Sequence, residues 1–323
     1  MTDYACLRLI PIALLLLLRS AVAQAGPVPS EVGFQSQQMP NGTAIGIWYP
    51  ANGEPVAEQL GPYEQDVVAG AIPVGVHHPL VVISHGTGGS YSGHYDTAIS
   101  LAQAGFVVAA LTHPGDNWKD QSRATDVQAR PIALSGLIDF MLTGWHDRDA
   151  VDPARVGAFG FSAGGFTVLA AAGGRPELSR IAGHCAVRPD LFDCRLLKAH
   201  PHAFALWRDT KDARIKAIVV AAPALGFAFD RNALRGVDIP VQLWRADDDQ
   251  ILPAPYYADA VRAALPHTPE FHTVPRAGHF DFLAPCVASA ARLQICSSKA
   301  GFDRMAFHRE FDAAVVRFFR QRL

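Results

Sequence analysis

The sequence contains few charged residues and carries almost no net charge. Only 18% of its 323 residues are Asp, Glu, Lys or Arg, and 28 basic against 30 acidic residues leave a formal charge of −2. Such a chain has no basic field to attract nucleic acid or an anionic membrane surface, so we expect neither as a partner. Internal repeats and low-complexity linkers are also missing. Half of the residues are apolar, which excludes a disordered chain and favours one globular domain.

Long hydrophobic runs are missing as well, except for one near the N-terminus. This run covers residues 9–18, follows Arg8 and precedes two small-x-small cleavage sites at 21–23 and 23–25. It is shorter than the roughly 20 residues that span a bilayer, and its flanks are typical of a signal peptide. We therefore predict a signal peptide at 1–25, export to the periplasm or the extracellular space, and a single domain at 26–323 without a membrane segment. An uncleaved membrane anchor is the alternative.

Cysteine is scarce, with five residues, and four of them form two local pairs. Cys6 lies in the predicted signal peptide, whereas the other four lie in segments that we expect to be poor in regular structure. In an oxidising compartment this pattern predicts the disulfides Cys185–Cys194 and Cys286–Cys296, although four cysteines allow three connectivities. A zinc site is the alternative, but the spacing does not resemble paired C-x-x-C ligands. We expect neither a metal nor an organic cofactor.

Apolar runs alternate with segments of helical spacing along most of the chain. The runs at 80–84 and 106–111 are typical of strands buried on both faces of a parallel sheet. Further strands are expected at 43–49 (at an edge), 154–159, 215–222, 239–244 and 270–274, and helices at 92–104, 124–142, 164–172, 255–265 and 303–320. This order predicts an α/β fold with a mostly parallel central sheet flanked by helices. The interval 173–213 interrupts the alternation and is expected to be a cap-like insertion above the carboxyl ends of the strands, where such folds bind ligands.

A candidate nucleophile, Ser162, lies in a G-x-S-x-G pattern at residues 160–164. The pattern is typical of a sharp turn between a strand and a helix, which lifts the serine Oγ above the sheet while small neighbours avoid a clash. A predicted strand precedes the motif, and a helix rich in Ala and Gly follows it. An ordinary glycine-rich turn is the alternative, and the partners described next argue against it.

Candidate partners of Ser162 follow in the order that this kind of turn requires. A serine hydroxyl needs a base that is itself oriented by a carboxylate, and the chain order is Ser, Asp or Glu, then His. One predicted strand ends in three adjacent carboxylates, Asp247, Asp248 and Asp249. His279 follows the last predicted strand and is the expected base. A solvated acidic loop and a structural histidine are the alternatives.

Two backbone N–H groups are candidates for an oxyanion hole. The transition state of acyl transfer carries an oxyanion, which needs preorganised donors. One is expected from Ala163, the residue after the nucleophile, and the other from Thr87 in the loop S-H-G-T-G-G at 84–89. A phosphate-binding loop is the alternative for these glycines, but the lysine of a G-x-x-x-x-G-K-[ST] motif is missing.

Together these residues resemble the α/β-hydrolase superfamily, and more narrowly its dienelactone-hydrolase-like and type II platelet-activating-factor acetylhydrolase-like branch. The similarity extends from about residue 40 to the C-terminus and rests on the stretches 82–86, 112–117, 160–165 and 277–282. In related sequences the acid typically precedes a proline by four residues, so the resemblance selects Asp249, which stands before Pro253. Dienelactone hydrolases use a cysteine nucleophile, whereas position 162 is serine here, so the resemblance implies ordinary carboxylic esters as substrates.

The resulting prediction is a secreted serine hydrolase that cleaves small-molecule carboxylic esters through an acyl-enzyme intermediate. Ser162, His279 and Asp249 form the triad, and the N–H groups of Thr87 and Ala163 hold the oxyanion. A peptidase or acyltransferase acting through the same triad is the alternative among enzymes. An inactive binding protein with a hydrolase fold is the alternative outside them.

Overall fold

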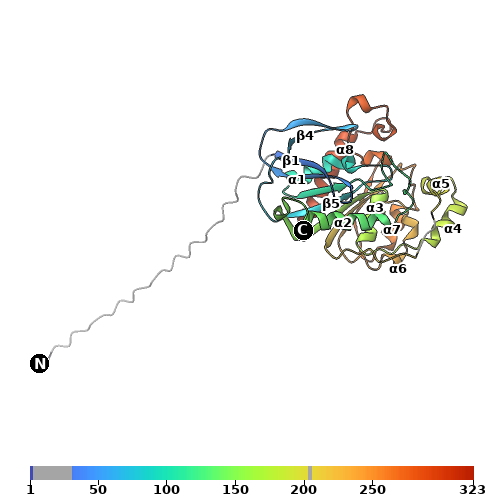
Figure 1. Ribbon diagram of the computed structural model, residues 1–323. Helices are drawn as coiled ribbons and strands as arrows, with labels where there is room; N and C mark the ends of the chain where they lie inside the picture. Colours follow the sequence, from blue (N-terminus) through green and yellow to red (C-terminus); the bar gives the residue numbers. More distant parts are fainter. Residues whose placement is uncertain (3–30, 203–205) are drawn as a thin grey trace.

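The computed structural model describes residues 1–2, 31–202 and 206–323 (Figure 1). The predicted signal peptide at 1–25 therefore lies outside the described residues, apart from its first two. Of the helices in the described ranges, none is both long and apolar enough to cross a membrane. From residue 31 onward the chain builds one sheet with helices on both of its faces.

All strands of the described residues join a ten-stranded sheet in the order β10-β9-β8-β7-β5-β6-β2-β1-β4-β3. The strands are β1 (Glu31–Gln38), β2 (Ala44–Ala51), β3 (Val56–Leu60), β4 (Tyr63–Ala69), β5 (His78–Ser84), β6 (Val107–Leu111), β7 (Val151–Phe161), β8 (Ile215–Ala221), β9 (Val241–Ala246) and β10 (Glu270–Val274). From β10 to β6 all neighbours run parallel, whereas β2 pairs antiparallel with both β6 and β1. The predicted α/β fold with a mostly parallel sheet is confirmed.

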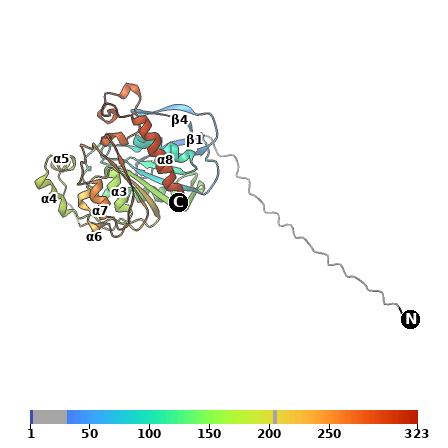
Figure 2. The ribbon, with the colours of Figure 1, turned by 180° about the vertical axis from the view of Figure 1, so that it is seen from behind.

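Helices cover both faces of this sheet. They are α1 (Tyr95–Gln103), α2 (Ala129–Thr143), α3 (Ala163–Ala171), α4 (Ser179–Val187), α5 (Phe192–Ala199), α6 (Arg231–Leu234), α7 (Ala258–Ala264) and α8 (Arg304–Arg322). One buried apolar cluster joins the sheet to α2, α3 and α7, and contains Leu134, Val168 and Val261. The other joins the opposite face to α1 and α8, and contains Leu101 and Phe311. Figures 1 and 2 view the molecule from opposite sides and show α2 and α3 in front in one view and α8 in front in the other.

The central strands place the candidate site. Residues 80–83 of β5 and 107–111 of β6 are at most 2% exposed, because their apolar side chains pack on both faces of the sheet. The register pairs Ser84, the last residue of β5, with Leu111 of β6 and Gly160 of β7. The loops that follow these three strands therefore start side by side at the carboxyl ends of the strands.

The prediction of an edge strand at 43–49 is wrong in its position. The strand is β2, which lies inside the sheet between β6 and β1 and is buried from residue 45 to 51. Three strands that the sequence did not reveal, β1, β3 and β4, extend the sheet beyond it. Phe34 of β1 packs against Trp48 of β2 with ring centroids 4.9 Å apart, and Trp48 Nε1 donates to Gln65 of β4 at 2.8 Å. These contacts cover β2 and make it an interior strand.

The interval 173–213 forms an insertion, but it contains two helices, α4 and α5 (Figure 1). Cys185 on α4 and Cys194 on α5 form one disulfide, so the expectation of little regular structure around this pair is wrong. The two helices bury few side chains, and the covalent link compensates by joining them directly. Cys286 and Cys296 form the second disulfide, in a segment of short 3₁₀ turns before α8.

Candidate active site

Ser162 occupies the sharp turn between the end of β7 and the start of α3. Its backbone has φ 56° and ψ −118°, outside the regions that residues with a Cβ prefer. A Cβ at Gly164 would lie 1.8 Å from the carbonyl oxygen of Ser84, and a Cβ at Gly160 would lie 2.0 Å from that of Gly164. The close passage of α3 over the end of β5 therefore requires glycine on both sides of the serine.

The structure brings Ser162, His279 and Asp249 together beyond the carboxyl ends of β7, β10 and β9. His279 Nε2 lies 3.0 Å from Ser162 Oγ, and His279 Nδ1 lies 2.7 Å from Asp249 Oδ2. The three residues are 5–7% exposed, and the ring of Phe161 packs against that of His279 with centroids 4.8 Å apart. Both distances are those of hydrogen bonds, so the imidazole can accept the serine proton while the carboxylate orients it.

Of the three adjacent aspartates at 247–249, Asp249 is the one that faces His279. The two before it form ion pairs with Arg245 and Lys299, respectively. Both of those carboxylates are more exposed than that of Asp249. The geometry thus separates a buried carboxylate at the histidine from two carboxylates engaged at the surface.

The environment of Asp249 keeps its carboxylate ionised. Its Oδ1 accepts hydrogen bonds from the backbone N–H groups of Ile251 at 2.9 Å and Leu252 at 2.7 Å. Burial acts to raise the pKa of Asp249, but His279 and these backbone donors outweigh it and lower the pKa overall. A carboxylate that is charged at neutral pH can hold the His279 Nδ1–H and stabilise the imidazolium when it forms.

Two backbone N–H groups beside Ser162 are free to bind an oxyanion. Within the described residues, neither the Thr87 N–H nor the Ala163 N–H has a hydrogen-bond acceptor. Ala163 follows the serine directly, and the loop of Thr87 passes so close that a Cβ at Gly86 would lie 3.1 Å from Ser162 Cβ. Thr87 and Ala163 also line the same cavity. The two expected donors therefore belong to residues that line one cavity.

This cavity lies beneath the insertion and is mostly apolar. Besides Thr87 and Ala163 it is lined by Phe166 and by side chains of α5, and its volume is about 30 Å³. Asp193 of α5 also lines it, and Asp193 Oδ1 accepts a hydrogen bond from the Tyr257 hydroxyl at 2.8 Å. Burial raises the pKa of Asp193. The insertion thus supplies one wall of the candidate site.

Hydrogen bonds of Asp281, including one from Arg304 on α8, fix the turn that carries His279. Asp281 Oδ2 accepts the Gly278 N–H at 2.7 Å, and Asp281 Oδ1 accepts from Arg304 Nε at 3.2 Å. Arg304 also donates to the carbonyl oxygen of Ile295, within the segment closed by the second disulfide. No sequence motif marks these residues as part of the site, although Asp281 lies in the stretch at 277–282 that resembles hydrolases.

Sequence reasoning also missed a buried ion pair beside the loop of Thr87. Arg130 of α2 pairs with Asp116, and each side chain is 3% exposed. Asp116 Oδ1 accepts the Gly88 N–H at 2.9 Å. Asp116 belongs to the resembling stretch at 112–117, but no pattern links it to a partner 14 residues further along the chain.

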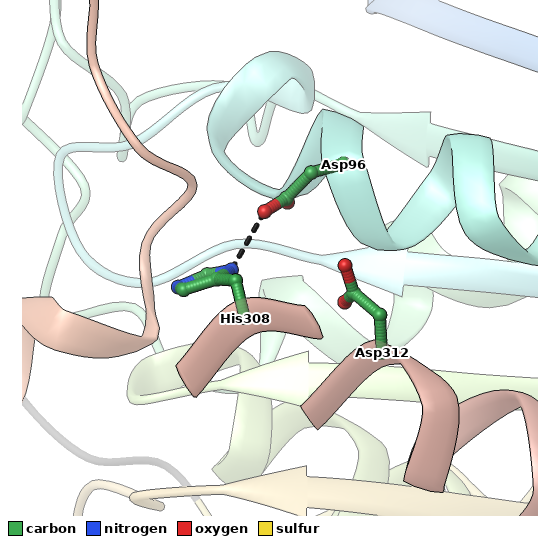
Figure 3. A group of neighbouring side chains, drawn as sticks. All are labelled: Asp96, His308 and Asp312. Atoms are coloured by element: carbon green, nitrogen blue, oxygen red, sulfur yellow. Dashed lines mark ion pairs between the residues drawn. The ribbon is translucent and has the colours of Figure 1, made fainter. Parts of the chain in front are cut away.

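A separate group of titratable side chains, Asp96, His308 and Asp312, lies between α1 and α8 (Figure 3). Its ligand atoms lie within 4.8 Å of one another, which is the arrangement of a small metal site. His308 Nε2 bonds to the carbonyl oxygen of Asp281 at 2.8 Å, and His308 Nδ1 forms an ion pair with Asp96 Oδ2 at 2.6 Å. Two ligands at bond lengths of about 2.1 Å lie roughly 3 Å apart. The separation of 2.6 Å is shorter than that, so the contact fits an ion pair better than two ligands of one metal ion.

Asp312 makes this group sensitive to pH. Burial, followed by the charge of Asp96, raises the pKa of Asp312 to about 8. An aspartate whose pKa rises on folding destabilises the folded state increasingly as the pH rises from about 4 toward the folded pKa.

Asp312→Asn keeps an acceptor for the Thr97 hydroxyl, now 2.6 Å away. We expect it to raise the unfolding midpoint by at least about 2 °C at pH 8 and much less at pH 5. Thermal denaturation followed by circular dichroism measures both, and an equal shift at the two pH values would contradict the raised pKa.

Comparisons with known proteins connect the chain to esterases. The family model "Platelet-activating factor acetylhydrolase, isoform II" matches residues 57–131, which include Thr87 and the Asp116–Arg130 pair. "Putative esterase NocK" from Nocardia uniformis subsp. tsuyamanensis is 26% identical over 183 residues, covering 51% of this chain and 53% of that protein. The chain thus spans about half the length of this relative. The structure of a ferulic acid esterase from Streptomyces cinnamoneus matches with a TM-score of 0.58 at 20% identity, covering 94% of this chain and 92% of that one. It has the same fold.

Proposed function

We propose that the chain is a serine esterase with an α/β-hydrolase fold, similar to platelet-activating factor acetylhydrolase isoform II, and that its triad is Ser162, His279 and Asp249. The observation that carries this proposal is the continuous line of hydrogen bonds from Ser162 Oγ through His279 to Asp249. The esterase names of the two similar proteins support the same chemistry. Besides water, ester cleavage by this route uses side chains and backbone groups that the site contains.

The proposed reaction has two steps. Ser162 Oγ attacks the ester carbonyl carbon while its proton passes to His279 Nε2, and Asp249 stabilises the imidazolium. The N–H groups of Thr87 and Ala163 hold the oxyanion, and His279 then gives the proton to the departing alcohol. A water molecule then attacks the acyl carbon while His279 takes its proton. His279 passes that proton to Ser162 Oγ as the bond between the acyl group and the serine breaks and the acid is released.

The cavity next to the oxyanion donors would hold the acyl part of the ester. With the carbonyl oxygen between Thr87 N–H and Ala163 N–H, the leaving oxygen must face His279 Nε2, which protonates it. Both donors line the cavity, and His279 does not belong to its lining. With a volume of about 30 Å³ and mostly apolar walls, the cavity is small and favours short acyl groups such as acetyl.

A series of p-nitrophenyl esters tests this assignment. We expect kcat/KM to fall by about tenfold or more from acetate to octanoate, because a poorly fitting methylene in an apolar pocket changes binding by about 1–3 kcal/mol. Leu196→Ala, which removes bulk from the α5 wall of the cavity, should shift the preference toward longer chains. Leu293→Ala, which changes an exposed leucine outside the cavity, should not. Absence of hydrolysis across the series would refute the esterase, whereas a preference for octanoate would refute only the role of the cavity.

We also propose that the protein is exported. Two disulfides are typical of proteins from oxidising compartments, and the sequence of residues 1–25 has the pattern of a signal peptide. Cell fractionation with mass spectrometry of the N-terminus should find the chain outside the cytosol, beginning after Ala23 or Ala25. Retention in the cytosol with free thiols would contradict export.

A further inference from the structure

One guanidinium group is buried between the two segments that supply the candidate oxyanion donors. Arg130 projects from α2, is 3% exposed and uses three different nitrogen atoms. Its Nη1 binds Asp116, its Nη2 binds the carbonyl oxygen of His85, and its Nε donates to Thr167 Oγ1 at 3.0 Å. The planar fork of arginine suits such a three-way junction, which a lysine ammonium on a flexible stem cannot reproduce.

The first two contacts fix the loop of Thr87. Arg130 holds the carbonyl oxygen of His85 on the near side of the loop. On the far side, Asp116 accepts the Gly88 N–H at 2.9 Å while it is itself held by Arg130. The 85–86 and 87–88 peptide groups are therefore both tied to one buried ion pair. They flank the 86–87 peptide group that carries the Thr87 N–H, so the pair restricts where this N–H points.

The third contact, from Arg130 Nε to Thr167, links Arg130 to the helix turn that begins with Ala163, the residue of the other expected donor. Thr167 lies one turn along α3 from Ala163, and its hydroxyl donates to the Ala163 carbonyl oxygen at 2.7 Å. The same hydroxyl oxygen accepts the hydrogen bond from Arg130 Nε. The first turn of α3, which begins with Ala163, is thus linked through Thr167 to the side chain that holds the loop of Thr87.

We propose that Arg130 is a positioning residue that sets the separation of the Thr87 and Ala163 N–H groups, acting through Asp116 and Thr167. This inference rests on the proposed esterase function. A buried ion pair is poor evidence of a stabilising role, because well-packed apolar residues often replace such pairs without loss of stability. The pair joins the two halves of the oxyanion hole, and that position gives it a function that an apolar replacement could not supply.

Disturbing this junction should affect the transition state and leave substrate binding nearly unchanged. An oxyanion forms only after Ser162 has attacked, so poorly placed donors lower kcat while KM stays close to its original value. Loss of a whole donor costs about 10²–10³-fold in kcat, so displacement of one should cost about tenfold.

Thr167→Val is the most informative variant, because valine has the shape of threonine and lacks the hydroxyl that links Arg130 to Ala163. Thr167→Ser restores that hydroxyl. Thr210→Val is a matched control, since the Thr210 hydroxyl also donates to a backbone carbonyl of α3, that of Ala170 at 3.3 Å, at the other end of the helix. We would measure kcat and KM for p-nitrophenyl acetate and the inhibition constant of an aryl trifluoromethyl ketone. This ketone accepts Ser162 Oγ at its carbonyl carbon and so forms an oxyanion.

We expect Thr167→Val to lower kcat about tenfold and to change KM less than twofold. The inhibition constant of the ketone should rise by the same tenfold. Thr167→Ser and Thr210→Val should stay within about twofold of the wild type. Arg130→Lys, confirmed as folded by circular dichroism, should lose at least as much kcat as Thr167→Val. Unchanged kcat or ketone inhibition in Thr167→Val, or an equal loss in Thr210→Val, would overturn the positioning role while the esterase function stands. If the wild type hydrolysed no ester, the proposed function would fail, and this inference with it.

Discussion

Replacing Ser162 with Ala should lower kcat for p-nitrophenyl acetate by about 10⁶-fold and leave a folded protein. The change removes Oγ, the atom 3.0 Å from His279 Nε2, and with it the group that would attack the ester. Alanine keeps the Cβ, so the turn between β7 and α3 and its packing stay as they are. A fluorophosphonate probe should label the wild type and fail to label the variant, and the hydrolysis rate should fall in parallel.

Ser179→Ala is the control for this experiment. Ser179 lies exposed at the start of α4, and its hydroxyl donates to Glu177 at 3.1 Å. This variant should keep both its activity and its labelling. Substantial hydrolysis by Ser162→Ala, or mapping of the label to another serine, would refute Ser162 as the nucleophile.

Replacing Asp249 with Asn should lower kcat by about 10⁴-fold. The Asn oxygen would remain with the Ile251 and Leu252 N–H groups, which now bind Asp249 Oδ1 at 2.9 and 2.7 Å. The amide NH₂ would then face His279 Nδ1 where Oδ2 now lies at 2.7 Å. A donor at that place favours the imidazole tautomer with its proton on Nε2, which cannot accept the proton of Ser162. Steady-state kinetics at pH 8 measure the loss.

Asp248→Asn provides the matched comparison, one residue away. Asp248 forms an ion pair with Lys299 at the surface, so its loss should change kcat by less than about threefold. If Asp248→Asn were the more damaging change, the acid of the triad would have to be reassigned.

The central part of the fold follows from the sequence, and the N-terminal part does not. β6 and residues 80–83 of β5 are uniformly apolar because they are buried on both faces, and such runs can be recognised without knowledge of their neighbours. β1 and β4 are only half buried and carry glutamines, so their sequences resemble a polar, irregular segment. Their strand character comes from pairing with other strands, including the parallel pairing of Gly33 in β1 with Val68 in β4. For the same reason β2 could be found as a strand but not placed in the sheet.

Some residues of the candidate site could likewise be predicted from the sequence, and others could not. Ser162 could be proposed from the sequence because the sharp turn that carries it requires neighbouring glycines. His279 could be proposed because the histidine of such a triad follows the serine and the acid in the chain. Choosing Asp249 over its two neighbours required the resemblance to hydrolases, since adjacent carboxylates differ only in the direction in which the turn sends them. No sequence pattern predicts the contacts of Arg130. Its partners come from three separate segments, and only the folded chain brings Asp116 and Thr167 to the same side chain.

The backbone of Ser162 has a consequence for the evolution of this chain. A residue with a Cβ at φ 56° and ψ −118° costs the folded state about 1–3 kcal/mol, a cost that glycine would largely avoid. Selection for stability alone would therefore favour glycine at position 162, whereas selection for ester cleavage requires the hydroxyl. A chain released from the need to catalyse could gain thermal stability by losing this serine. Under the proposed esterase function, Ser162 and the glycines at 160 and 164 that accommodate its turn form a place where catalysis takes precedence over stability.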